Sequence, residues 1–326
     1  MGFERSFRLV IVALTAIYIP SCVENLITVH VHPDGQYSML FRTKGDSTDV
    51  FDSDFPHPSG PEWSTHISKE VNNETDVWTM LTTGMISGSY IFTSRSDSLT
   101  SLQHPIQVIK KEGYFATRYI LRNVFVGRQV YRKYPAFAQS LQQSDEDSTR
   151  WLEDVFIYMT TQGLKDLQKD PETTINDELA DRIENHIRNT MVRIGQKDLF
   201  EELENKLSFI DQMLRPFSKD LPIGYVTLLS NATDVYEEEL KLTNDLHDDQ
   251  FEYRAMMPGV ISWTNADTMI QDTLFWSFGL QKFLNDDHII EASSVVYSSQ
   301  RIQTAVIIIA VLFLTVLYFT YRRGQK

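Results

Sequence analysis

Two histidines in the chain are spaced so that they could bind a metal together. His30 and His32 lie two residues apart in a run that alternates apolar and polar residues. Side chains two apart on a strand share a face, so we expect both imidazoles opposite Ile27, Val29 and Val31. Protein zinc sites use at least three protein ligands, and the sequence identifies no third one. We therefore interpret the pair as exposed polar residues of a half-buried strand, and we predict no metal and no cofactor.

The sequence contains none of the short motifs that carry hydrolytic or phosphate chemistry. Ser, His and Asp are plentiful, but no Gly-x-Ser-x-Gly, His-Glu-x-x-His or phosphate-binding glycine loop occurs. One acidic run lacks the central glycine and the terminal glutamate of a calcium-binding loop; it comprises Asp46, Asp49, Asp52 and Asp54. We predict a protein without enzymatic activity. The alternative, an extracytoplasmic hydrolase, would need a cleft that holds a perturbed acid or nucleophile.

Basic side chains crowd one short stretch of an otherwise acidic chain. They are Lys110, Lys111, Arg118, Arg122, Arg128, Arg132 and Lys133. Aromatic residues are interleaved with them, namely Tyr114, Phe115, Tyr119, Tyr131 and Tyr134. Such a group could bind an anionic partner, and beside a membrane each exposed basic side chain would add about 1 kcal/mol of attraction to phospholipid head groups. In the alternative interpretation, these bases pair with acidic helices of the same domain.

The chain as a whole has a formal net charge of −14 and a pI near 5.0. This charge argues against a general electrostatic attraction to nucleic acid. Cys22 is the only cysteine, so no disulfide can form within the chain and its stability must come from a hydrophobic core. The lack of cysteine pairs favours a bacterial source over an animal cell surface.

The N-terminal end has the pattern of a secretory signal. Arg5 and Arg8 precede an apolar run over 9–19 that is too short to span a membrane. The segment Ile19–Cys22 resembles the lipobox of bacterial lipoproteins, from which Pro20 departs. We therefore predict a signal peptide over 1–22, with lipidation of Cys22 as one interpretation and a chance cysteine after an ordinary signal as the other.

The C-terminal end predicts a transmembrane helix. Residues 302–321 carry no charge, and at 1.5 Å per residue they would form a helix about 30 Å long. Arg322, Arg323 and Lys326 make the tail positive, so residues 322–326 are expected in the cytoplasm. We predict a single-pass membrane protein whose domain over 23–300 is extracytoplasmic.

Between these ends the period of the apolar residues changes twice. Alternation by two predicts a hairpin over 25–41 with a Pro-Asp-Gly turn and further strands over 106–130. Past Tyr225 the strand period returns, with the first strand at Phe251, Tyr253 and Ala255. A period near four between them predicts three helices that lie on a sheet, with Asp170-Pro171 starting the second and Asp198 capping the third with Glu201. The fold class is therefore α+β: an antiparallel sheet with a three-helix insertion over 145–219, plus the transmembrane helix.

Two stretches resemble the LppM-type bacterial lipoprotein domain. One is Cys22 followed by Ile27–Gly35, and the other is Pro258–Asp267 followed by Leu274-Phe275-Trp276. The resemblance covers both ends of the ectodomain, about a third of the chain, and the helical block over 151–214 departs from it. It implies a cell-envelope domain with lipid or glycolipid binding and without enzymatic activity.

These observations predict a membrane-anchored cell-envelope protein whose outward domain binds a partner. Membrane lipid is one expected partner and an envelope protein is the other, and nucleic acid is not expected. A lipid- or glycolipid-binding domain with a groove between sheet and helices is an alternative within the binding class.

Overall fold

The computed structural model describes residues 23–51, 55–71, 76–90, 101–141, 151–191, 193–194 and 205–324. Several predictions therefore lie outside the described residues. These are the signal peptide over 1–22, the lipidation of Cys22, the capping box of Asp198 and Glu201, and the end of the basic tail at Lys326.

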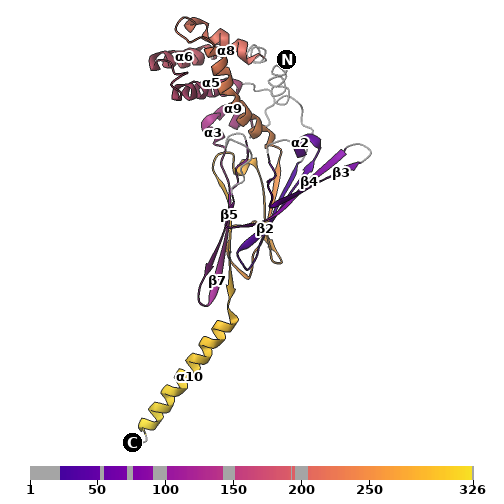
Figure 1. The fold of residues 1–326 in the computed structure, drawn as a ribbon, viewed down its shortest axis with the longest axis vertical. Helices are drawn as coiled ribbons and strands as arrows, with labels where there is room; N and C mark the ends of the chain where they lie inside the picture. Colours follow the sequence, from indigo (N-terminus) through magenta and orange to yellow (C-terminus); the bar gives the residue numbers. More distant parts are fainter. Residues whose placement is uncertain are drawn as a thin grey trace.

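Two β-sheets form the body of the protein (Figure 1). The larger sheet has, in spatial order, β10 (Thr268–Ile270), β11 (Thr273–Gly279), β8 (Gln250–Met256), β1 (Glu24–Val31), β2 (Gln36–Gly45), β4 (Asp76–Ser87) and β3 (Trp63–Val71). The smaller sheet has β5 (Ser89–Tyr90), β6 (Ile106–Glu112), β7 (Ala116–Phe125), β12 (His288–Tyr297) and β9 (Val260–Thr264). Only the β1–β8 pair is parallel among the strand pairs of the described residues. The predicted α+β class, dominated by antiparallel pairing, is confirmed.

Apolar side chains from both sheets meet in one core. Ile27 and Val29 of β1 are buried together with Leu121 of β7 and Ile290 of β12. The ring of Phe125 in the smaller sheet lies 6.0 Å from that of Phe251 in the larger one, centroid to centroid. The alternating pattern in strands such as β1, β2 and β8 sets this arrangement, because the apolar face of each is removed from water.

The hairpin predicted over 25–41 is present. β1 pairs with β2 in continuous antiparallel register from Glu24 opposite Lys44 to Val31 opposite Tyr37. In the turn, the Gly35 N–H donates to the His32 carbonyl over 2.9 Å. Gly35 adopts a φ of +95°, which residues with a Cβ rarely adopt, so the Pro-Asp-Gly sequence accounts for the tight return of the chain.

The helices gather at one end of the two sheets (Figure 1). They are α5 (Trp151–Lys169), α6 (Asp177–Met191), α8 (Lys206–Leu214) and α9 (Tyr225–Asp245), with the short α2 (Ser47–Phe51), α3 (Val130–Lys133) and α4 (Pro135–Ser140) nearby. We call α5, α6, α8 and α9 the helical block. It has its own buried core, which includes Ile183, Phe209 and Leu229. The prediction that the helices lie on a sheet is confirmed in part. Val155 of α5 and Leu240 of α9 belong to the core of the two sheets, whereas other apolar residues of the helices pack together in the core of the block.

Two helix boundaries differ from those predicted. Asp170 and Pro171 do not start a helix; they lie in a turn that ends α5, where the Thr173 hydroxyl donates to the Leu167 carbonyl over 2.8 Å. α6 starts later, and the Asn176 side chain accepts from the Glu178 N–H over 2.8 Å. α9 lies beyond the predicted boundary at residue 219, in a stretch where the strand period was expected to return.

One helix in the described part of the chain is long and apolar enough to cross a membrane. α10 (Ser299–Gly324) follows β12 after a single residue, and its stretch Ser299–Tyr318 has a mean hydropathy of 2.1 with no part buried. It extends from the end of the sheets opposite the helical block (Figure 1). The predicted membrane span of 302–321 falls within this helix.

Candidate functional site

The basic stretch predicted as an anionic-partner site is divided by the structure into two groups. Lys110 and Lys111 lie on β6, and Arg118 and Arg122 lie on β7. Arg128, Arg132 and Lys133 lie beyond the end of β7, next to or within α3. Because β7 runs from the α10 end of the sheets toward the helical block, the two groups face different surroundings.

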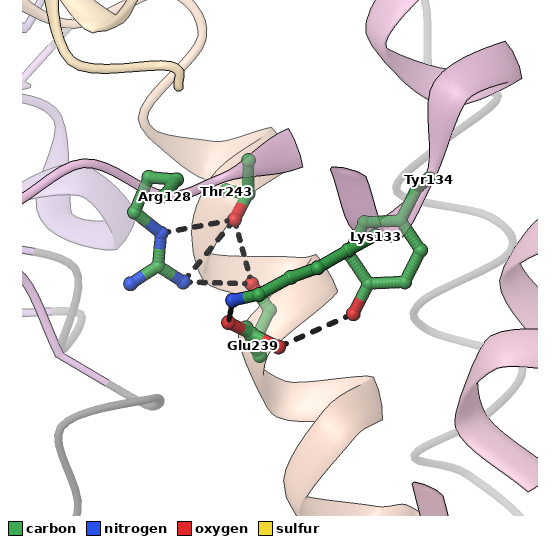
Figure 2. A network of polar contacts seen from close by, with 5 residues as sticks. All are labelled: Arg128, Lys133, Tyr134, Glu239 and Thr243. Atoms are coloured by element: carbon green, nitrogen blue, oxygen red, sulfur yellow. Dashed lines mark hydrogen bonds and ion pairs between the residues drawn. The ribbon is translucent and has the colours of Figure 1, made fainter. Parts of the chain in front are cut away.

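Two bases of the group near α3, Arg128 and Lys133, are bonded to α9 (Figure 2). Lys133 Nζ donates to Glu239 Oε1 in an ion pair, and the Tyr134 hydroxyl donates to Glu239 Oε2 over 3.2 Å. Arg128 Nη2 donates over 3.2 Å both to the Glu239 carbonyl oxygen and to the Thr243 hydroxyl. For Arg128 and Lys133 the alternative interpretation therefore holds, since both are bonded to an acidic helix of the same protein.

Burial gives this network its electrostatic character. Glu239 is only 1% exposed and Arg128 only 6%. Burial, followed by the charge of Glu239, raises the pKa of the Tyr134 hydroxyl far above its ordinary value, so the hydroxyl stays a hydrogen-bond donor at any physiological pH. Burial lowers the pKa of the Arg128 guanidinium, and nearby Glu239 opposes that effect. The network joins the end of β7 to α9 and leaves these two bases unavailable to an outside partner.

The group on β6 and β7 stands in a different setting. Lys111 and Arg118 are directly opposite each other on the two strands, and both are exposed. Arg122, also exposed, is opposite Glu291 of β12. Lys110 is on the other face of β6, where its Nζ lies 2.8 Å from Glu112 Oε1. Of the predicted site, Lys111 and Arg118 are thus a neighbouring pair of exposed cations.

The β6–β7 hairpin ends against the start of α10. The Ser298 N–H donates to the Phe115 carbonyl over 2.8 Å, and Arg301 Nη1 donates to the Tyr114 carbonyl over 3.2 Å. The Arg301 guanidinium also lies 5.6 Å from the centre of the Tyr114 ring. Tyr114 and Phe115 are 67% and 47% exposed. This hairpin tip therefore places two exposed aromatic side chains beside the first turn of the apolar helix.

His30 of β1 and His32, the residue after β1, lie together, as the spacing predicts. The ring centroids of His30 and His32 are 4.5 Å apart. Burial and the neighbouring His32 lower the pKa of His30. His32 Nε2 lies 3.2 Å from the Ser38 hydroxyl. Within the described residues, no three His, Cys, Asp or Glu side chains converge as a metal site would require.

A chain of buried polar contacts within the larger sheet had no signal in the sequence. Asn25 donates to Asp249 over 2.8 Å, and its amide oxygen accepts from the Thr43 hydroxyl over 2.7 Å. Thr43 has thereby used its proton, so His57 Nε2, 2.9 Å away, must be the donor to Thr43. His57 Nδ1 then accepts from the Thr82 hydroxyl over 2.8 Å. The chain joins residues up to 224 positions apart in the sequence, which local patterns cannot reveal.

This polar chain resembles a nucleophile beside a base, but its geometry does not suit catalysis. Thr82 is completely buried. Burial lowers the pKa of His57 to about 4, so its imidazole has little affinity for a proton at neutral pH. Each polar group forms a hydrogen bond with its neighbour, as expected of polar groups that are buried.

A groove of about 390 Å³ lies on the outer face of the larger sheet. Its walls include Leu26, Arg42, Glu252 and Phe275, and the first three are neighbours across strands β2, β1 and β8. Glu252 is also bonded to Arg254, with 2.6 Å between its Oε1 and Arg254 Nε. The groove is thus open to solvent. None of its described wall residues belongs to the helical block, although Glu24 and Gln250 lie at the end of β1 and β8 nearest that block. The lipid-binding alternative places its cleft between sheet and helices.

Comparisons with known proteins add little to this geometry. No protein-family model matches the chain, and a search of curated proteins gives no match. Among solved structures, the chain is weakly similar to the NMR structure of the folded domain of Mycobacterium tuberculosis LppM. The TM-score is 0.29 at 7% sequence identity, over 88% of this chain and 97% of that one. Likeness at this level carries no argument about function, and the resemblance drawn from the turn motifs stays a prediction.

Proposed function

We propose that this chain is a membrane-anchored, non-enzymatic protein of the cell envelope that holds its helical block away from the lipid surface to bind a protein partner. The observation that carries the proposal is α10, an exposed apolar helix that continues from β12 at the end opposite the helical block. A helix of this length that is apolar on every side needs either protein or lipid around it.

The distribution of charge supports the same orientation. Residues 151–245 contain twenty acidic and ten basic side chains, a net charge of −10 out of −14 for the whole chain. An acidic block is repelled by the anionic surface of a membrane, whereas basic side chains are attracted to it. The acidic helical block is therefore suited to contact a partner with a basic surface.

The filling of the interior favours an external binding surface over an internal lipid cavity. Large aromatic side chains of both sheets are completely or almost completely buried between them, among them Tyr37, Phe41, Phe125 and Phe251. The groove on the outer face of the larger sheet is open and mixes apolar and charged walls. For the hydrolase alternative, the nearest arrangement is His57 with Thr82, whose hydroxyl is shielded from solvent.

Membrane extraction and protease protection test the proposal together. Membranes that contain the full chain are washed at high pH, and a second sample of right-side-out vesicles is treated with protease. We expect the full chain to stay in the membrane pellet, and the helical block to be degraded without opening the vesicles. A chain that ends at Ser298 is the matched control, and we expect it in the supernatant. Release of the full chain at high pH, or protection of the helical block, would contradict the proposal.

A further inference from the structure

Lys111 and Arg118 form a like-charge pair across two neighbouring strands. They are directly opposite each other in the β6–β7 register, and both side chains are exposed on the outer face of the smaller sheet. Like charges directly opposite each other on neighbouring strands destabilise a sheet. An anion bound between the two cations would offset their repulsion.

No acidic side chain in the described part of the protein supplies that anion. Across β12, the residue opposite Arg118 is Val295, whereas the residue opposite Arg122 is Glu291. Glu112 is bonded to Lys110, which points to the other face of β6. Within the described ranges, neither Lys111 nor Arg118 has a side-chain hydrogen bond or an ion pair. The pair is thus available to an anion from outside.

The surroundings of the pair indicate where that anion comes from. One residue pair, Glu112 with Thr117, separates Lys111 and Arg118 from the hairpin tip, which contacts the first turn of α10. Three exposed aromatic residues lie at this end: Tyr114, Phe115 and, two residues before α10, Tyr297. Tyrosine at a membrane prefers the head-group region. Long basic side chains just above that level reach the lipid phosphates.

We infer that Lys111 and Arg118 bind the phosphate of an anionic phospholipid in the leaflet that α10 enters. This inference rests on the proposed function, because it requires α10 in the bilayer. The two cations flank one phosphate, the aromatic hairpin tip lies among the glycerol and upper acyl regions, and Arg301 holds that tip against the helix. The contact fixes the tilt and rotation of the sheets above the membrane, which a single helix leaves free.

Lipid retention by the full chain tests the inference. The protein is purified in detergent, incubated with phosphatidylglycerol or phosphatidylcholine, and analysed by native mass spectrometry for bound lipid. We expect retention of phosphatidylglycerol over phosphatidylcholine, and a loss of about tenfold or more in that preference when Lys111→Gln and Arg118→Gln are combined. Arg122→Gln is the matched control. It removes one cation from the same face of β7, but at a position opposite an acidic residue, Glu291. We expect this variant to keep the wild-type preference for phosphatidylglycerol.

Two readouts separate the outcomes. Charge reversal by Lys111→Glu with Arg118→Glu should abolish the preference, while thermal unfolding of the double Gln variant should occur at the same or a higher temperature because a repulsion is removed. Equal lipid retention by wild type and the double Gln variant, or equal loss in Arg122→Gln, overturns the inference. High-pH extraction of the same variants reports on α10 alone, so failure of the anchor is recognised independently of failure of the lipid site.

Discussion

At the scale of single residues, Glu239 is a buried charge whose loss should destabilise the fold. Its carboxylate is shared by Lys133 and Tyr134, and its side chain is almost fully removed from water. Breaking a buried ion pair by removing one partner leaves the other charge uncompensated, which costs about 3 kcal/mol. We expect Glu239→Gln to lower the free energy of unfolding by about that amount, as measured by urea denaturation followed by near-UV circular dichroism.

The neighbouring residue supplies the control for that measurement. Glu238 precedes Glu239 on α9 but is exposed. Glu238→Gln should change the free energy of unfolding by less than about 0.5 kcal/mol, as is usual for a surface substitution. Similar effects of the two substitutions would show that the network in Figure 2 contributes little beyond helix propensity.

His57 makes a second prediction at this scale, on the pH dependence of stability. Burial lowers its pKa to about 4 from an ordinary value of 6.5, so the unfolded chain binds a proton more readily than the folded one. The stabilisation is complete above pH 6.5 and is lost as the pH falls from there through 4. Two and a half pKa units correspond to about 3 kcal/mol at full effect.

Replacement of His57 measures how much of the acid-induced loss of stability is due to this residue. Burial also lowers the pKa of His104, to about 3, so acid destabilisation will persist without His57. In His57→Gln, the fall in unfolding free energy between pH 7 and pH 4 should shrink by about 3 kcal/mol. His66→Gln, at an exposed position of β3, should leave the fall unchanged. A wild-type slope in the His57 variant would refute the prediction.

The residue types alone identify the basic stretch, but they do not show which of its bases are buried and which are exposed. Spacing on β6 and β7 is local, so the sequence places Lys111, Arg118 and Arg122 on strands and near one another. The partner of Lys133 lies 106 residues away, and nothing in the local pattern distinguishes Glu239 from its exposed neighbours. Burial of a charge depends on the packing of distant elements, and for that reason the loss of Arg128 and Lys133 from the site was not predictable.

At the scale of elements, the contact between α5 and α9 depends on a glycine. A Cβ on Gly163 of α5 would lie 3.2 Å from Leu229 Cδ1 and from Thr233 Cγ2 of α9. Alanine there requires small shifts, which are offset by its better helix propensity of up to about 1 kcal/mol. Valine adds further atoms into a filled contact, which typically costs 1–3 kcal/mol.

The expected result is a contrast between two substitutions. Gly163→Ala should leave the free energy of unfolding within about 1 kcal/mol of wild type. Gly163→Val should lower it by about 2 kcal/mol, and near-UV spectra should show loosened packing around Tyr225 and Phe209, which are buried in the same core. Equal stability of both variants would mean that α5 and α9 can separate freely.

The elements differ in how far sequence predicts them, for a physical reason. The strands alternate apolar and polar residues because the sheets are covered on one face, and this period is visible without a structure. The buried face of α9 includes Ser230, Thr233, Glu239 and Thr243, so its apolar stripe is interrupted and the helix escaped prediction. Asp170-Pro171 was predicted to start the second helix, but these residues form the turn that follows α5. The Asp170 carboxylate accepts from the Glu172 N–H within this turn.

At the scale of the whole molecule, the two predicted anchors belong to opposite ends. Val23 lies at the helical end, where its carbonyl accepts from the Gln250 N–H just after α9, and β1 then runs toward the turn beside Tyr119. The eight residues of β1 span about 26 Å at 3.3 Å per residue. If α10 crosses a bilayer as proposed, Val23 lies far from that bilayer unless the sheets lie flat along its surface.

Fluorescence quenching distinguishes an upright molecule from one that lies flat on the membrane. In a Cys22→Ser background, a fluorophore is attached at Glu24→Cys or at Phe115→Cys, both exposed positions, and the full chain is reconstituted into vesicles that contain nitroxide-labelled lipids. The hairpin tip contacts the first turn of α10 through Ser298 and Arg301, so the label at 115 should be strongly quenched. The label at 24, at the far end of β1, should keep the intensity it has in unlabelled lipid. Comparable quenching at both positions would place the sheets along the membrane surface, within reach of an acyl chain on Cys22, and would remove the basis for an outward-facing helical block.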